Sequence, residues 1–110
     1  MAIYVKTDNP QNLLDKVKKT IDEGKVQSWM YDEDGDFQHS PKILERGAWL
    51  RPVVTEKYLI LAIVKPKNEE LSTLTYAAYH GQFIEMMLRH FDKLFDTIFA
   101  SSQKTKYDIF

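Results

Sequence analysis

The chain contains no cysteine, and glycine and proline each account for only four of its 110 residues. The absence of cysteine excludes a disulfide framework, a thiolate zinc site and a cysteine nucleophile. The glycines are too dispersed to cradle a phosphate group, and the sequence has no GxGxxG, Walker-type or GxSxG motif. We therefore expect no cofactor, and the residues favour a protein that is not an enzyme.

Long hydrophobic runs and an excess of charge of one sign are also missing. The longest mainly apolar stretch, residues 58–64, is far too short to span a bilayer, and residues 1–6 lack the features of a signal peptide. Fifteen Lys and Arg against sixteen Asp and Glu leave a formal charge of -1, which provides no long-range field for a phosphate backbone. We expect a cytoplasmic protein without membrane contact, for which nucleic acid is a disfavoured partner.

Apolar residues make up 44% of the chain and aromatic residues 13%, which is enough to form the core of one domain. We place a single α+β domain at residues 1–100. Residues 101–110 are mostly polar and lack periodicity, so we expect a flexible tail. The alternative is that this tail adds an edge strand or docks in a groove of a neighbouring copy, since it contains Tyr107, Ile109 and Phe110.

The first third of the chain predicts a strand followed by a helix. Residues 3–6 alternate between apolar and polar side chains, as a half-buried strand does. Asp8 or Asn9 suits the capping position of a helix, and Pro10 suits its first helical position. Gly24 stands where a left-handed residue commonly ends a helix.

Two hairpins are predicted in the middle of the chain. Asp34-Gly35 lies between extended runs at residues 25–31 and 37–39 and suits a type I′ turn. Residues 40–47 favour a short helical turn that begins at Ser40-Pro41. Residues 49–54 are extended again, and Pro52 indicates an edge strand or a bulge. Residues 58–64 are apolar on both faces, which predicts the central strand of the sheet.

The last third predicts one long helix, capped by Ser72 and running from Leu74 to Ile98. Its first apolar stripe is expected to pack on the sheet and contains Leu74, Ala77, Gly81, Ile84, Leu88, Phe91, Phe95 and Ile98. A second stripe runs beside it through Tyr76, Phe83, Met87, His90 and Leu94, with Tyr79 and Met86 further round. The predicted fold is α+β, with a four- or five-stranded, mostly antiparallel sheet, two helices on one face, and the order β-α-β-β-β-β-α.

The apolar arc of this helix is too wide for one contact, so part of it needs a second surface to cover it. We expect a homodimer whose interface is formed by Phe83, Met86, Met87, His90 and Leu94. The chain would then be a non-enzymatic interaction module that self-associates through its long helix; any other protein partner is unidentified. The alternative is that the second stripe is covered within one chain.

A second hypothesis places a small-molecule or enzymatic pocket beside His80. Its walls would come from Tyr76, Tyr79, Trp29 and Trp49. The simpler interpretation is a core histidine that is hydrogen-bonded to a carbonyl or hydroxyl group. A small RNA-directed regulatory protein is a third possibility, which rests on analogy of fold alone.

No set of residues predicts a metal site. His80, Glu85 and His90 follow one another at intervals of five, which separates successive side chains by about 140° around a helix. Asp32, Asp34 and Asp36 resemble the start of a calcium loop, but Gly35 is misplaced and Ile43 stands where a glutamate is required. We expect an exposed turn at these aspartates.

Overall fold

The computed structural model describes residues 1–39 and 48–110. The helical turn expected over residues 40–47 lies outside the described residues. No helix in the described part of the chain is long and apolar enough to cross a membrane.

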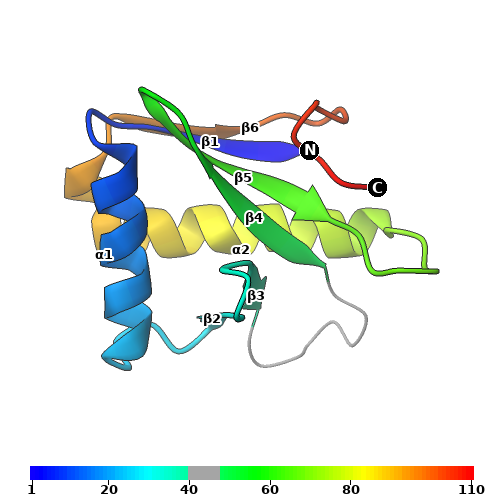
Figure 1. The fold of residues 1–110 in the computed structure, drawn as a ribbon, viewed down its shortest axis with the longest axis horizontal. Helices are drawn as coiled ribbons and strands as arrows, with labels where there is room; N and C mark the ends of the chain where they lie inside the picture. The colour runs from blue at the N-terminus through cyan, green and yellow to red at the C-terminus, as the bar shows by residue number, and fades with distance from the viewer. Residues whose placement is uncertain (40–47) are drawn as a thin grey trace.

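Within these described residues, six strands form one antiparallel sheet, and two helices complete the α+β fold (Figure 1). The elements are β1 (Ala2–Lys6), α1 (Pro10–Asp22), β2 (Trp29–Tyr31), β3 (Phe37–His39), β4 (Trp49–Val54), β5 (Tyr58–Val64), α2 (Thr73–Phe91), the 3-10 helix η1 (Asp92–Leu94) and β6 (Thr97–Ala100). The sheet order is β2-β3-β4-β5-β1-β6. The predicted class is confirmed, although the sheet has more strands than expected.

Helix α1 forms for the reasons that its sequence indicates. The side chain of Asn9 accepts a hydrogen bond from the amide of Asn12, and Pro10 occupies the first turn. The chain leaves the helix through Gly24, whose φ of 77° lies in the left-handed region that favours glycine. Leu13, Leu14 and Val17 are buried against the sheet.

Strand β5 lies between β4 and β1, as its apolar faces predict. Pro52 in β4 is accommodated because β3 pairs with β4 only at Leu50. Beyond that residue, one side of β4 is in effect an edge, so the missing amide of Pro52 removes no bond to β3. Pro52 therefore lies at a local edge, although β4 is not an edge strand of the sheet.

The β2-β3 hairpin forms where it was predicted, but with a different turn. Gly35 has a positive φ of 83°, and no other residue of the turn does, whereas a type I′ turn requires two. Asp32 organises the turn instead, because its Oδ1 accepts the amides of Asp34 and Asp36.

The prediction of one unbroken helix to Ile98 is wrong. Helix α2 ends at Phe91, and Thr97–Ala100 forms the edge strand β6, which pairs with β1. The spacing of Phe91, Phe95 and Ile98 fits a helix, but Phe95 and Ile98 reach the core from an extended chain. Pairing with the distant β1 determines this outcome, because Thr, Ile and Phe are all favourable strand residues.

The assignment of the α2 faces is also wrong. As far as Met87, the second stripe lies on the buried side of α2, since Tyr79, Phe83 and Met87 are at most 2% exposed. Its last members, His90 and Leu94, are exposed. In the first stripe, expected to pack on the sheet, Leu74 is 70% and Leu88 48% exposed, and only Phe91 at the end of α2 is buried, at 3%. Two parallel apolar stripes look alike in the sequence, and only the position of the sheet distinguishes them.

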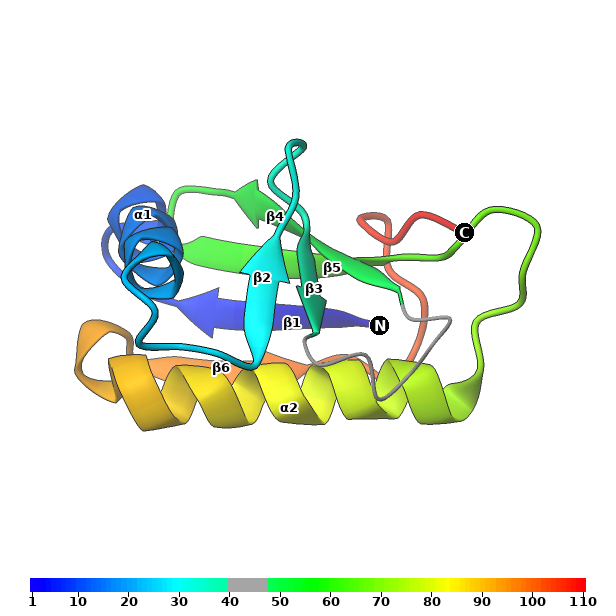
Figure 2. The same ribbon diagram turned by 90° about the horizontal axis from the view of Figure 1, so that it is seen from below.

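Both helices and the β2-β3 hairpin enclose one core on the same side of the central strands (Figure 2). Ile3, Leu61 and Pro52 are opposite one another on neighbouring strands and so share a face. Ile3 and Leu61 are fully buried and belong to the same cluster as the buried residues of α1 and α2. The helices therefore cover one face of the sheet, as predicted.

Candidate interaction surface

His80 is a core residue whose two ring nitrogens both contact carbonyl oxygens. Nδ1 lies 3.0 Å from the carbonyl oxygen of Tyr76, and Nε2 lies 2.8 Å from that of Met1. The ring of Tyr76 packs edge-on against the imidazole, with centroids 4.6 Å apart. His80 thus anchors α2 to the start of β1, which agrees with the simpler interpretation of this residue.

Burial lowers the pKa of His80, and the two carbonyl contacts oppose this shift only in part. The folded pKa lies below the unfolded value of 6.5, so the unfolded chain binds more protons as the pH falls through 6.5. We expect the free energy of unfolding to be lower at pH 5.5 than at pH 7.5, and this difference to be smaller in His80→Gln. Urea unfolding at both pH values measures the effect. If the free energy of unfolding of His80→Gln changed between the two pH values as much as that of the wild type, the prediction would be contradicted.

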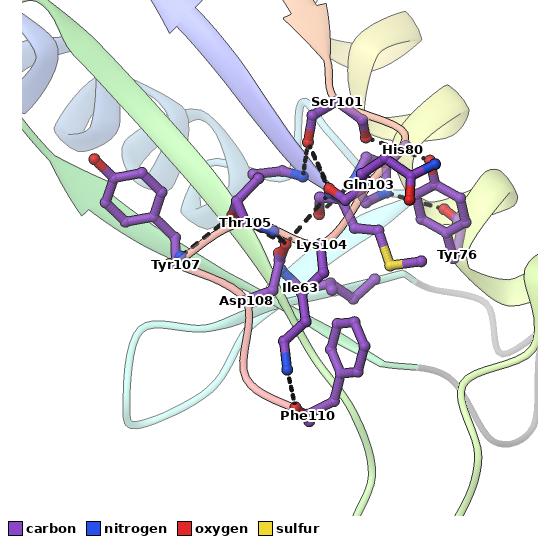
Figure 3. A network of polar contacts seen from close by, with 12 residues as sticks. Ile63, Tyr76, His80, Ser101, Gln103, Lys104, Thr105, Tyr107, Asp108 and Phe110 are labelled. Carbon is purple, nitrogen blue, oxygen red and sulfur yellow. Dashed lines mark hydrogen bonds and ion pairs between the residues drawn. The ribbon is translucent and has the colours of Figure 1, made fainter.

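The segment after β6 lies against the end of β5 (Figure 3). This segment and His80 both contact Met1, the first residue of the chain. The carboxylate of Asp108 accepts hydrogen bonds from the amides of Ile63 and Thr105 and lies 3.3 Å from the amino group of Met1. Ile109 forms a parallel bridge with Val64. Residues 101–110 therefore dock on the sheet; their flexibility stays a prediction.

The five residues of the predicted pocket do not surround a common cavity in the described part of the chain. Tyr76 and His80 contact each other, while Trp29 and Tyr79 pack edge to face in the core with centroids 5.5 Å apart. Trp49 is half-buried, and because Leu50 enters the core, the strand alternation directs Trp49 to the opposite face. The geometry brings two pairs together and separates the fifth residue from both.

A cleft of about 320 Å³ lies elsewhere, between the start of α1 and the turn before β6. Its lining residues are Thr7, Asp8, Asn9, Asn12, Leu13, Lys93, Leu94, Phe95 and Asp96. Sequence reasoning missed it, because the two sides of the cleft, residues 7–13 and 93–96, are far apart in the sequence and no motif marks either of them. The Thr7 hydroxyl donates to the carbonyl of Leu94 at 2.9 Å, which holds the two sides together.

Two of the three aspartates in the acidic turn at residues 32–36 make hydrogen bonds that stabilise the fold. Both carboxylate oxygens of Asp36 accept hydrogen bonds from Arg51, at 3.0 and 2.8 Å. This contact raises the pKa of the Arg51 guanidinium. Although the carboxylates of Asp32, Asp34 and Asp36 lie within 4.8 Å of one another, Asp32 also serves the backbone of the turn.

Three of the five predicted interface residues are not on the surface. Phe83, Met86 and Met87 are at most 1% exposed within a single chain, so a second copy cannot contact them. His90 and Leu94 are exposed, at the C-terminal end of α2 and in η1. The interface predicted for these residues must therefore be corrected, and the apolar surface of α2 lies on its other side.

The outward side of α2 has an apolar stripe, the outer stripe, formed by Leu74, Ala77, Gly81, Ile84 and Leu88. All of these residues except the half-buried Ile84 are exposed. Their spacing of three and four is that of a helix-pairing seam. A methyl group added at Gly81 would meet no other part of the described chain within 4 Å, so packing within the chain does not require glycine there.

The outer stripe lies beside the β6 edge of the sheet. The Tyr76 hydroxyl donates to the carbonyl of Ser101, and His80 contacts Met1, so the flank of α2 with these two residues faces β1 and β6. At about 100° per residue, Ile84, Ala77, Leu88 and Gly81 follow His80 in turn around the helix. Figure 2 shows α2 running along β6.

On the other face of the sheet, three aromatic rings meet. Tyr4 and Phe99 stack with centroids 5.0 Å apart, and Tyr58 packs edge-on against both. The register places Phe99 opposite Tyr4, whereas Tyr58 is opposite Lys6 and so lies diagonal to Tyr4 on the same face of the sheet. Phe99 is 46% exposed. The aromatic cluster thus extends to the edge strand.

These features define a class of protein. Without the β2-β3 hairpin, the order β1-α1-β4-β5-α2-β6 and the sheet order β4-β5-β1-β6 are the ferredoxin-like arrangement. The described residues therefore form a small ferredoxin-like α+β domain with an inserted hairpin, an open edge at β6 and an exposed helix stripe.

Sequence comparison adds distant similarity. The replication factor C small subunits of Methanococcus maripaludis strains C5 and C7 are each 22% identical over 89 residues, which are 81% of this chain and 28% of each relative. The chain thus spans little more than a quarter of the length of these relatives, and this identity does not place it in their family. No family model and no solved structure matches the chain.

Proposed function

We propose that this protein is a non-enzymatic interaction module that self-associates through the outer stripe of α2. The observation that carries the proposal is the exposure of Leu74 and Leu88 on one face, at 70% and 48%. Between them lie the small residues Ala77 and Gly81, over which a second helix can approach closely. The proposal keeps the helix that the sequence predicts for self-association and changes the face that it uses.

Gly81 supports a contact outside the chain. Glycine within a helix costs about 0.5–1 kcal/mol relative to alanine, and no packing in the described chain requires it here. Close approach of a second backbone is a physical reason for glycine at this position. The outer stripe has no charged member, so two copies bring no like charges together within it.

The test is to measure the molar mass of the wild type and of Gly81→Met by light scattering. The protein concentration is varied from about 10 to about 500 μM, a range in which weak dimers form. We expect the wild type to approach the mass of a dimer as the concentration rises. A Cβ atom at Gly81 meets no other described residue within 4 Å, and methionine has a better helix propensity than glycine, so Gly81→Met should stay folded. It should remain a monomer, because the new side chain separates the helices.

The matched control is Gln82→Met, which places the same side chain one residue further along α2. Gln82 is exposed but outside the outer stripe, so this variant should dimerise like the wild type. Equal dimerisation of Gly81→Met and Gln82→Met, or a wild type that stays monomeric at every concentration, would overturn the proposal.

A further inference from the structure

The outer edge of β6 presents backbone groups that have no partner among the described residues. The amide of Ser101 donates to the carbonyl of Ala2 at 2.9 Å, which makes these two residues a hydrogen-bonded pair. In an antiparallel ladder such pairs alternate with pairs that do not bond to each other. The register of β1 and β6 therefore directs the N–H and C=O groups of Ile98 and Ala100 away from β1.

The β6 edge also lacks the features that prevent strands from pairing. Thr97–Ala100 contains no charged residue and no proline. The opposite edge strand, β2, has only three residues and is followed by the acidic turn at residues 32–36. Compared with the β2 edge, β6 is thus better suited to accept another strand.

We propose that β6 pairs with β6 of a second copy of this chain, antiparallel and centred on Phe99. This proposal rests on the self-association proposed above and names the backbone contact within it. In this register Ile98 of one copy is opposite Ala100 of the other, so the outward groups form two hydrogen-bonded pairs with four bonds. The two sheets become one continuous sheet of twelve strands, twice the six of one chain.

Two further contacts of this arrangement favour a second copy over an unrelated strand. The two Phe99 side chains face each other as a close cross-strand pair, which covers rings now 46% exposed and joins the aromatic clusters. The twofold axis also brings the two α2 helices side by side and antiparallel on the same face of the sheet. Their outer stripes, which flank β6, then meet.

The distribution of exposed apolar side chains agrees with this interface. Among the described residues, eight large hydrophobic side chains are strongly exposed: Met30, Val54, Leu74, Leu88, Leu94, Phe99, Ile109 and Phe110. Four of the eight belong to α2, η1 or β6. One interface across α2 and β6 can therefore cover three of the eight, Leu74, Leu88 and Phe99.

Amide hydrogen exchange measured by NMR tests the pairing directly. The exchange rates of the Ile98 and Ala100 amides are compared in dilute and concentrated protein. We expect both amides to exchange at least about tenfold more slowly at the concentration where light scattering shows a dimer, because only the dimer gives them acceptors. The Phe99 amide, which faces β1, serves as the internal reference and should change less.

A proline at Ala100 tests the same bonds independently. Ala100→Pro removes an amide that points away from β1, so the ladder with β1 remains and an edge strand tolerates the change. Ala100→Ser keeps the amide and is the matched control. We expect the proline variant, with an unchanged circular dichroism spectrum, to dimerise at least about tenfold more weakly than the serine variant.

The outcomes separate this inference from the proposed function. A dimer that Gly81→Met abolishes, but in which the Ile98 and Ala100 amides gain no protection, leaves the outer stripe as the interface and overturns the β6 pairing. A wild type that is monomeric at all concentrations overturns both. If the proline and serine variants dimerise equally, the pairing of β6 is also overturned.

Discussion

Replacing Phe83 by alanine should lower the free energy of unfolding by about 3–5 kcal/mol, a larger loss than we expect from removing any of the polar contacts described above. Phe83 is fully buried, and its ring packs edge to face against Trp29 and Phe37, with centroids 5.1 and 5.5 Å apart. The smaller side chain would leave a cavity between α2 and the β2-β3 hairpin. Urea unfolding followed by circular dichroism gives the difference.

Leu88→Ala is the matched control, because it shortens an apolar side chain on the same helix but on the exposed side. In dilute, monomeric protein its effect should stay within about 0.5 kcal/mol. The pair of variants also decides between the two faces of α2. A stable, folded Phe83→Ala monomer would mean that Phe83 forms an intermolecular contact, and the assignment of the core would then be incorrect.

Replacing Asp108 by alanine should cost about 1–3 kcal/mol at pH 7, because the buried amide of Ile63 and the amide of Thr105 lose their acceptor. The side chain of Asp108 is fully covered, and the Thr105 hydroxyl also donates to it at 3.0 Å. We expect residues 101–110 to release from β5 before the whole domain unfolds. Hydrogen exchange of the Ile63 and Ile109 amides reports this release.

The same change has a predictable pH dependence. Burial alone raises the pKa of Asp108, but the hydrogen bonds from Thr105 and Ile63 outweigh it, so the pKa lies below the unfolded value of 3.8. The ionised carboxylate therefore stabilises the fold above pH 3.8, and this contribution is lost as the pH falls through the folded pKa.

The stability difference between wild type and Asp108→Ala should thus be largest near neutral pH and shrink in strong acid. Glu33→Ala, which removes an exposed carboxylate from the β2-β3 turn, controls for the change in net charge. A difference that is the same at pH 7 and at pH 2.5 would show that the ionised carboxylate makes no special contribution.

The parts of the fold that local residues decide could be predicted. Asn9, Pro10 and Gly24 mark the ends of α1, because capping and left-handed residues act over a few positions. Apolar side chains on both faces of residues 58–64 identified the central strand. The hairpin around Gly35 was located correctly because glycine there has a positive φ, although the turn type was not predicted.

The parts that depend on distant segments could not be predicted. The same three-and-four spacing continues from α2 through Phe95 and Ile98, and only pairing with β1 makes those residues extended. The cleft between Thr7 and Leu94 and the contacts of Asp108 likewise join residues that no local pattern connects. The prediction of which side of α2 is exposed was wrong for the same reason, because the position of the sheet decides it.

The amino-acid sequence by itself determined the class of fold, the position of α1, the β2-β3 hairpin and the central strand, because backbone preference and side-chain alternation are local properties. Only the tertiary structure decided where α2 ends, which of its stripes is buried, and that β6 is an open edge. These outcomes depend on which distant strand or helix lies alongside, and that choice is made by the free energy of the whole packed domain.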